Sequence, residues 1–443
     1  MNGNLIHKKM YNTSQYLINN PSTNTNVRSP KKIKNWIAGA LIGVYYLLVW
    51  APPFLPSVEA RWYIPLALSI FAFFILKPVF TLRASILYWV IYGISFLGAA
   101  ISLFRAPWFD QALWNTVGMG ISFVTFLLFV PVLSNKISRR ILLFILIVSA
   151  FFWVFEIQNL IKEHGTLIYS TFSETGENKN DVGYSMAMAA TALLFLAVFW
   201  KPNKKMHPLG LFGLKVLFGL SGFYLIYSQA LIYARGGLVA SITGIFALIT
   251  IFIHRNRRKF PRIIQAVIFV LVIAVSVKFI LPKLLTISPQ WISMSTRASN
   301  EGLLSIFNKR DVLLEKGIYI ISQNPIIGVG LGGSRYPITS TNQQFPGLLI
   351  HNTYLTNWAE LGILGILSDI IMVLVYIKLC RKRFSTATFV DQIWLLLFIP
   401  WSVQMMFMNV NSVVMIAILA GIYYEQYLLV LNSKIHLLRA RRK

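Results

Sequence analysis

The sequence predicts an all-α protein that crosses a membrane many times. Of its 443 residues, 56% are hydrophobic and only 12% are charged, whereas soluble globular proteins carry about 25% charged residues. The apolar residues are gathered into long stretches, and the basic residues fall mainly between alternate stretches. Composition and pattern together exclude a soluble enzyme, a disordered chain and a disulfide-rich secreted module.

Twelve apolar stretches are long enough and poor enough in charge to cross a bilayer. A helix is the form that such a stretch adopts, because lipid offers the backbone no hydrogen-bond partners. We therefore predict about twelve transmembrane helices, with the only large loop between the ninth and the tenth. They cover residues 36–55, 61–79, 84–104, 112–134, 141–160, 183–200, 211–230, 237–253, 263–282, 358–379, 390–409 and 412–431.

The charges are distributed asymmetrically around these stretches. The chain has 41 Lys and Arg residues against 14 Asp and Glu residues, a formal net charge of +27. With a cytoplasmic N-terminus, 29 of the basic residues lie in segments on the cytoplasmic side, and nine acidic residues lie on the outer side. This is the positive-inside bias of a membrane protein. It disfavours nucleic acid as a partner and makes acidic membrane lipids the expected contact of the basic loops.

The ends of the predicted helices divide the chain into five segments. These are a disordered cytoplasmic tail, nine helices, an extracytoplasmic loop subdomain, three further helices and a basic cytoplasmic tail. Their boundaries are 1–35, 36–282, 283–357, 358–431 and 432–443.

An amphipathic helix is expected inside the extracytoplasmic loop, at residues 308–322. Asn308 is suited to cap its start, and Asp311 complements the positive end of the helix dipole. Pro325 prevents the helix from continuing much further.

Arg235 stands at the predicted start of the eighth helix, on the outer side of the membrane. A cation at the start of a helix gains nothing from the helix dipole. The position is explained if an anion binds there, held by the guanidinium and by the free N–H groups of the first turn. Gly236 and Gly237 would let that anion approach the backbone. The alternative, equally supported by the residues, is an arginine that reaches to lipid headgroups.

Two other residues on the outer side are candidates for the same site. Arg310 lies in the first turn of the loop helix, where it would help to hold a diphosphate or, alternatively, pair in solvent with Asp311 or Glu315. His351 lies where the loop enters the tenth helix. A neutral imidazole there would accept a proton from a sugar hydroxyl. The alternative is a structural histidine, hydrogen-bonded at a helix start.

Neither a metal nor a cofactor is expected. The sequence has no CxxC, HExxH or DxD-type cluster, and its six histidines have no ligand spacing. Gly328, Gly330 and Gly333 have the spacing of a dinucleotide-binding loop, but no βαβ unit surrounds them. We interpret this stretch as a turn-forming loop.

At the end of the loop, His351 and Asn352 are followed after nine residues by Gly362 and Gly365, in the pattern H-N-x9-G-x-x-G. This pattern resembles the signature of the O-antigen ligase and polymerase superfamily of bacterial membrane glycan-assembly proteins.

Three more features extend the resemblance over most of the chain. Arg235 is similar to the family's arginine in the small loop between spans seven and eight. Arg310, followed by the run 324-NPIIGVGLGG-333, resembles the second essential arginine and its N-P-x-x-G-x-G motif. Asn180, in 178-NKNDVGYSMA-187, lies in a stretch that resembles the family's Asn-rich entry to a span.

The resemblance implies a GT-C-like glycosyltransferase that takes a glycan from a polyprenyl (undecaprenyl) diphosphate carrier. The acceptor would be lipid-linked or a protein, such as the lipid A–core of lipopolysaccharide. The reaction would need no metal or cofactor and would invert the anomeric carbon. The site would face the periplasm or exterior from the bacterial plasma (inner) membrane.

The resemblance also implies roles for individual residues. The donor diphosphate would be bound by Arg235, Arg310 and Gly236, and the acceptor hydroxyl would be oriented or deprotonated by His351. Asn352 and Asn180 would support the acceptor or the loop.

Other functions remain open at this point. A polysaccharide polymerase and a protein O-oligosaccharyltransferase share the same signature and differ from a ligase in the acceptor. A secondary transporter also commonly has twelve spans, and Asp369 and Glu156 are ionisable residues in or near the predicted spans. The chain shows no repeated halves of the kind found in transporters. A non-catalytic scaffold of an envelope complex is a third alternative.

Overall fold

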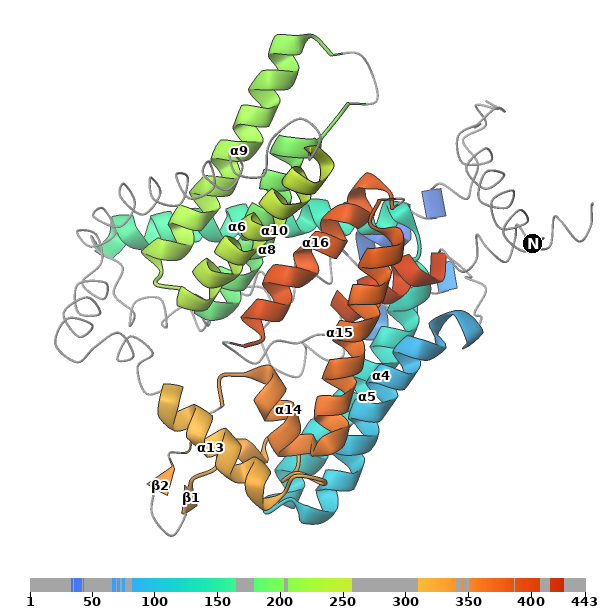
Figure 1. The fold of residues 1–443 in the computed structure, drawn as a ribbon, viewed down its shortest axis with the longest axis vertical. Helices are drawn as coiled ribbons and strands as arrows, with labels where there is room; N and C mark the ends of the chain where they lie inside the picture. The colour runs from blue at the N-terminus through green and yellow to red at the C-terminus, as the bar shows by residue number, and fades with distance from the viewer. Residues whose placement is uncertain are drawn as a thin grey trace, which may run out of the picture.

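The computed structural model describes residues 82–164, 179–202, 206–256, 310–339, 350–385, 387–406 and 415–425, with short pieces before residue 82 and around residue 345. Within these residues the protein is helical apart from one two-stranded antiparallel ribbon (Figure 1). Its elements are α4 (Leu82–Ser102), η2 (Leu103–Arg105), α5 (Phe109–Leu133), α6 (Lys136–His164), α8 (Lys179–Phe199), α9 (Pro208–Leu231), α10 (Arg235–Asn256), α13 (Arg310–Gln323), η4 (Gly333–Arg335), β1 (Ile338–Thr339), β2 (Gln344–Phe345), α14 (Thr353–Leu361), α15 (Ile363–Arg383) and α16 (Phe389–Gln404).

Among the described residues, six helices are long and apolar enough to cross a membrane, which confirms the all-helical, multi-pass class. They lie in α5, α6, α8, α9, α10 and α15, and three shorter apolar helices cover Val90–Arg105, Phe389–Gln404 and Met415–Glu425. The predicted spans at 36–55, 61–79 and 263–282 lie wholly or largely outside the described residues. The total of twelve spans and the five-segment division therefore stay predictions.

The predicted tenth span is wrong as a single helix. The sequence suggests one helix over 358–379, but the structure has α14 and α15, separated at Gly362. Gly362 has φ +66° and ψ −152°, a conformation almost restricted to glycine. A Cβ at this position would lie 2.0 Å from the carbonyl oxygen of Ile326. The apolar pattern of the sequence continues across the break at Gly362, so a prediction based on hydropathy joins the two helices into one.

Helix α8 forms the centre of a bundle with α6, α9, α10 and α16. In the apolar, membrane-spanning stretch of α8, 78% of the residues are buried, compared with 11% in that of α9. Small residues allow this close packing: a Cβ on Gly244 of α10 would lie 2.2 Å from Oγ1 of Thr191 in α8. Close approach through small residues is how helices associate in lipid, where burial of apolar surface gives no driving force.

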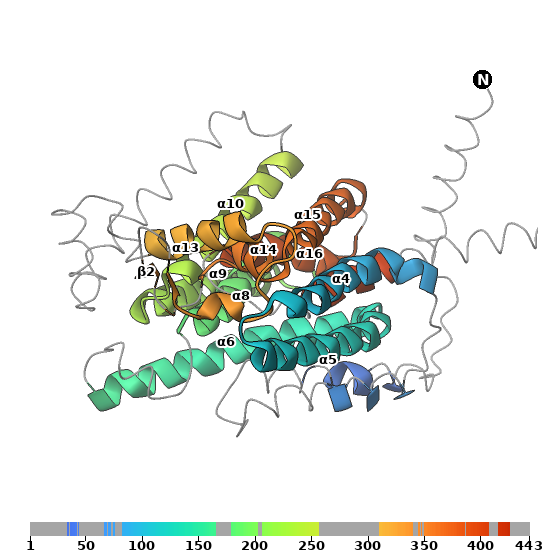
Figure 2. The same ribbon diagram turned by 90° about the horizontal axis from the view of Figure 1, so that it is seen from below.

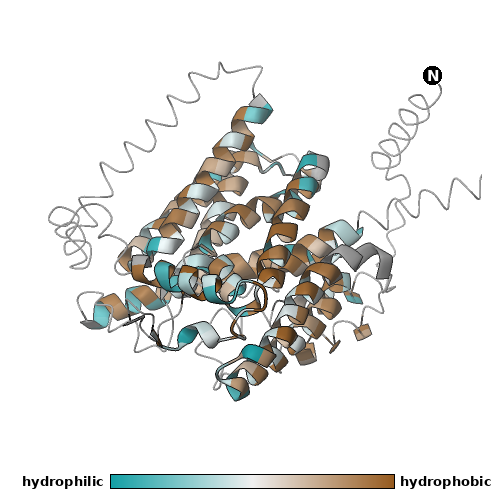
Figure 3. Ribbon diagram, turned by 60° about the horizontal axis from the view of Figure 1, so that its bottom comes forward, coloured by the Kyte–Doolittle hydropathy of each residue, from teal (hydrophilic) through white to brown (hydrophobic). Residues whose placement is uncertain are grey.

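Hydrophobic residues, drawn in brown, make up most of the long helices (Figure 3), and many of their large apolar side chains are exposed. On α9, Phe212, Leu217 and Leu220 are 67%, 57% and 64% exposed. Such an apolar surface is rare on a soluble monomer and is the surface that a bilayer requires.

The bundle has two ends, which we name after the arginine found at each. Helices α8 and α10 run parallel, because their glycine contacts advance together along both helices. Helix α16 runs antiparallel to α10, since Arg255 near the end of α10 donates to Gln392 in the first turn of α16 at 2.7 Å. The start of α10 and the end of α16 therefore share the Arg235 end, and the starts of α6 and α16 share the Arg139 end. Helices α13 and α14 lie across the Arg235 end (Figures 1 and 2).

Candidate functional site

The turn between α9 and α10 determines where Arg235 lies. Helix α9 ends in a Schellman motif, in which the Tyr233 N–H donates to the Ala230 oxygen (3.1 Å) and the Ala234 N–H donates to the Gln229 oxygen (3.0 Å). Tyr233 occupies the left-handed position of this motif, with φ +56°, where glycine is usual. A side chain in that conformation costs about 1–3 kcal/mol. The backbone is therefore strained two residues before Arg235.

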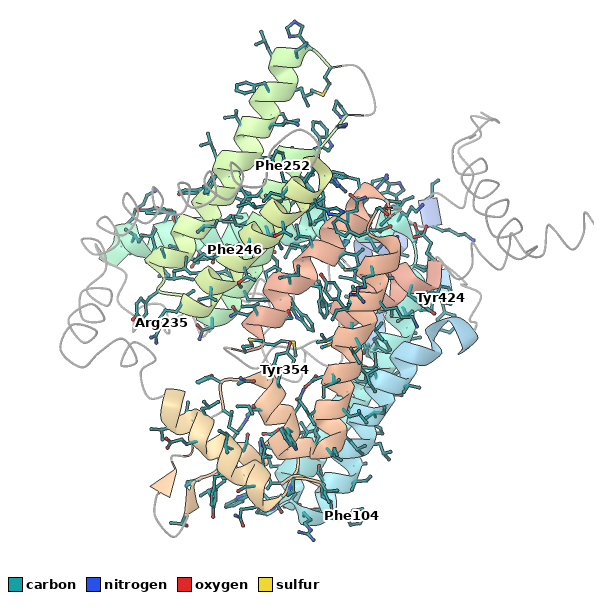
Figure 4. All side chains as sticks on the ribbon, in the orientation of Figure 1. Phe104, Arg235, Phe246, Phe252, Tyr354 and Tyr424 are labelled. Carbon is teal, nitrogen blue, oxygen red and sulfur yellow. The ribbon has the colours of Figure 1, made fainter. Side chains whose placement is uncertain are left out.

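Arg235 is the first residue of α10, as predicted. It is half-buried, and its guanidinium carbon lies 5.0 Å from the centroid of the Tyr233 ring. Figure 4 shows the side chain at the lower end of α10. The first N–H groups of a helix have no acceptor within the helix, and this end carries partial positive charge. A guanidinium and a helix start in one turn can bind an anion.

The structure corrects the role predicted for the second glycine after Arg235. A Cβ on Gly237 would lie 2.7 Å from the carbonyl oxygen of Gly183 in α8. The missing side chain therefore admits helix α8 and not an anion. Gly236 is buried in the same turn, and its contact with an anion stays a prediction. The close packing also sets the half-buried Asn180, in the first turn of α8, at the Arg235 end.

His351 and Asn352 lie at the start of α14. Asn352 caps this helix, because its side-chain oxygen accepts the N–H of Leu355 at 3.1 Å. The half-buried His351 directly precedes the cap. His351 thus stands at a helix start, as both of its interpretations require, and proton transfer by this residue stays a prediction.

The end of α16 brings α14 to the same end of the bundle as Arg235. The N–H of Thr353 donates to the Met405 oxygen at 2.7 Å, and the hydroxyl of Tyr354 donates to the Ser402 oxygen at 3.2 Å. Figure 4 shows Tyr354 just below the end of α16. Because α16 ends beside the start of α10, these bonds place His351 and Arg235 at one end of the bundle.

Helix α13 confirms the predicted loop helix, with its start at Arg310 and its end two residues before Pro325. Its first turn lies on the same side of the molecule as the α9–α10 turn (Figures 1 and 2). The side chain of Arg310, and Asn308, lie outside what the structure describes. The convergence of Arg310 with Arg235 is therefore a prediction. Helix α13 packs on α14 through a small apolar core of Ile320, Ile321, Ile350 and Ala359.

The glycine-rich stretch after α13 is a turn-forming loop, as predicted. Gly328, Gly330 and Gly332 have φ values of +79°, +85° and +83°. The N–H of Gly330 donates to the main-chain oxygen of Glu360 at 3.0 Å. A Cβ on Gly328 would lie 2.4 Å from that oxygen. These glycines let the loop pack against the backbone of α14.

Two buried charged residues missed by the sequence analysis hold the loop and α13 on α14. The Glu360 carboxylate accepts the Gly332 N–H at 2.8 Å and the hydroxyl of Ser334. Burial raises the pKa of Glu360, and these two hydrogen bonds oppose the rise. Lys316 of α13 is fully buried. Burial lowers its pKa to about 8, and attraction to Glu360 opposes the fall.

A signal for Lys316 was present in the sequence. Lys316 lies three residues after Leu313 and four before Ile320, both of which are buried. This spacing puts all three on one face of a helix. A charge on the apolar face of an amphipathic helix indicates a buried partner.

Asp369 and Glu156, the ionisable residues that suggested a transporter, differ in burial and in their contacts. Asp369 of α15 is buried, and its carboxylate accepts the Asn357 amide of α14 at 2.9 Å. It thus ties α14 to α15. Glu156 is half-buried on α6. Among the residues that the structure describes, no three His, Cys, Asp or Glu side chains lie close enough to hold a metal ion.

Residues 220–368 match the family model described as O-antigen ligase. The matched region begins in α9 and ends in α15, so it contains Arg235, Arg310 and His351 and excludes Asn180. Comparison with curated proteins gives no match. The match agrees with the resemblance drawn from the motifs: residues 220–368 of this multi-pass membrane protein are similar to an O-antigen ligase domain.

Proposed function

We propose that this protein transfers a glycan from a polyprenyl diphosphate to an acceptor at the outer face of the bacterial plasma membrane. The observation that carries the proposal is the shared location of Arg235 and His351. Both stand at helix starts, at one end of the bundle, within the region similar to an O-antigen ligase domain. A cation and a proton acceptor at the same end of the bundle suit a substrate with an anionic leaving group and a hydroxyl nucleophile.

Arg235 and Arg310 bind the donor diphosphate in this proposal. When the bond between the anomeric carbon and the diphosphate breaks, negative charge grows on the departing phosphate oxygen. A guanidinium held at a helix start stabilises that charge more than it stabilises the bound donor. Because two arginines supply the counter-charge, the reaction proceeds without a divalent cation.

His351 accepts the proton of the acceptor hydroxyl as the hydroxyl oxygen attacks the anomeric carbon. Attack from the side opposite the diphosphate inverts the configuration. A positioned general base contributes about 10²- to 10⁴-fold to such a step. Asn352 keeps His351 in place by capping α14.

Members of this superfamily differ in the acceptor of the glycan. The H-N-x9-G-x-x-G spacing favours a ligase, whose acceptor is the lipid A–core of lipopolysaccharide. A polymerase would use a second lipid-linked glycan, and a protein O-oligosaccharyltransferase would use a hydroxyl on a protein.

The test uses purified protein with undecaprenyl-diphosphate glycan and each acceptor in turn, in the presence of EDTA. We expect joined product with one acceptor class. His351→Gln should retain donor binding and lose transfer, Arg310→Ala should lose donor binding, and Glu315→Gln, an exposed change on α13, should leave both unchanged. A strict requirement for a divalent cation contradicts the mechanism. Movement of intact donor glycan across vesicles without joining would favour a transporter.

A further inference from the structure

Among the described residues, Tyr233 is the only residue other than glycine with a positive φ, at +56°. The position demands this conformation, because the Schellman bonds from residues 233 and 234 close the end of α9 around it. Glycine adopts it without a steric penalty, and a tyrosine does not. Strained residues that persist in a fold are concentrated at functional sites.

The ring of Tyr233 has a partner that accounts for its presence. The Arg235 guanidinium lies over it, with 5.0 Å between the guanidinium carbon and the ring centroid. The Arg235 N–H also donates to the Tyr233 oxygen at 3.0 Å, so one short turn fixes both groups. The ring and the cation are therefore coupled through the backbone as well as through space.

A ring restrains an arginine in a different way from a carboxylate. A carboxylate neutralises the charge and occupies the N–H groups on the edge of the guanidinium. An aromatic ring attracts the flat face of the guanidinium and does not itself use the N–H donors on the edge. A phosphate group takes up such donors bidentately.

We propose that Tyr233 is a positioning residue, whose ring holds the Arg235 guanidinium in the orientation that binds the donor diphosphate. The strained backbone is retained because only a side chain at this left-handed position brings a ring beneath Arg235. The inference rests on the proposed function, since it concerns the same diphosphate site.

The test compares three substitutions, with undecaprenyl diphosphate as the probe and purified full-length protein in nanodiscs. Tyr233→Phe keeps the ring and should bind as the wild type does. Tyr233→Gly relieves the strain, so it should raise the melting temperature while weakening binding by about 3- to 10-fold. Tyr233→Asn, which tolerates the left-handed conformation without a ring, should show the same loss. Tyr224→Ala, an exposed ring on α9, is the matched control and should leave binding unchanged.

The outcomes separate this inference from the proposed function. A merely structural tyrosine predicts that the glycine variant gains stability and keeps its affinity, which would overturn the inference. Weak binding by Tyr233→Phe would overturn it too, because the hydroxyl and not the ring would then matter. If the wild-type protein fails to bind undecaprenyl diphosphate, or if Arg235→Ala binds as tightly, the proposed function itself is overturned.

Discussion

The two ends of the helical bundle use an arginine in opposite ways. At the Arg139 end, Arg139 is fully buried and each of its three guanidinium nitrogens donates a hydrogen bond. Its Nε donates to Asp391 at 2.7 Å, its Nη2 to Glu425 at 2.5 Å and its Nη1 to the Leu133 oxygen at 2.5 Å. At the Arg235 end, Arg235 is half-buried, and its guanidinium lies over the face of the Tyr233 ring.

This difference separates a structural cation from a cation suited to bind a ligand. The bonds of Arg139 join α6 to α16 and to the segment that ends at Glu425, where Lys136 adds an ion pair at 3.1 Å. A charge with such partners holds helices together and offers nothing to a substrate. Arg235 instead lies at the start of α10, two residues after the strained Tyr233. In the proposed function it binds the donor there, at the end of the bundle opposite Arg139.

The largest effect is expected at the Arg139 end. Arg139→Ala removes the cation that is paired with the buried Asp391 and leaves Glu425 with Lys136 alone. Removal of one partner from a buried pair costs about 3–5 kcal/mol. Unfolding in detergent, followed by circular dichroism, measures the loss. The control is Arg140→Ala, because Arg140 is exposed and its loss should change stability little. Equal effects of the two substitutions would remove the distinction between the ends.

The next effect is expected at the Arg235 end, and it concerns rate and not stability. Arg235→Ala removes charge stabilisation at the leaving group, which typically costs about 10²- to 10³-fold in rate. Glycan transfer and thermal unfolding should be measured on the same preparation. Arg105→Ala, an exposed arginine in η2, should keep both values. A large fall in the unfolding temperature of Arg235→Ala would show that this arginine, too, is structural.

A smaller effect tests the packing that fixes the start of α10. Gly237→Ala places a methyl group 2.7 Å from the Gly183 oxygen, and such overpacking costs about 1–3 kcal/mol. Gly213→Ala in α9 is the matched change, since no atom lies within 4 Å of the added Cβ. It should be neutral or stabilising by up to about 1 kcal/mol. If both variants unfold alike, the contact between α8 and α10 is not close.

The smallest effect distinguishes Arg139 from Lys316, both of which are fully buried. Arginine stays charged when buried, whereas a buried lysine changes its pKa. Lys316 has a pKa of about 8 against an ordinary value of 10.5. Between these values the unfolded chain binds more protons than the folded protein, so folding stability rises with pH.

The rise amounts to at most about 1.4 kcal/mol per pH unit. Unfolding of the wild type and of Lys316→Met from pH 7.5 to pH 10 measures it. The difference in stability between the two proteins should change in favour of the wild type as the pH increases. A constant difference would mean that Lys316 titrates normally.

The sequence predicted much of the fold and only fragments of the site. It correctly placed α13 and the turn before α10, because the residues that start and stop helices, and apolar runs, are local signals. Arg139 lies between the predicted spans 112–134 and 141–160 and is one of the 29 basic residues assigned to the cytoplasmic side. The structure shows the same residue buried and paired with Asp391 and Glu425. Those carboxylates lie more than 250 residues away in the chain, and no local pattern links them to it.

The amino-acid sequence alone was sufficient for the membrane class and for most of the described helices, and it supplied the candidate residues Arg235, Arg310 and His351. Each of these follows from composition, from apolar length or from spacing within a short segment. Only the tertiary structure decided that α14 breaks from α15 at Gly362, that Gly237 admits α8, and that Tyr233 lies strained beneath Arg235. These features depend on contacts between distant segments and on single backbone angles. Neither kind of feature produces a repeating pattern in the sequence from which it could be predicted.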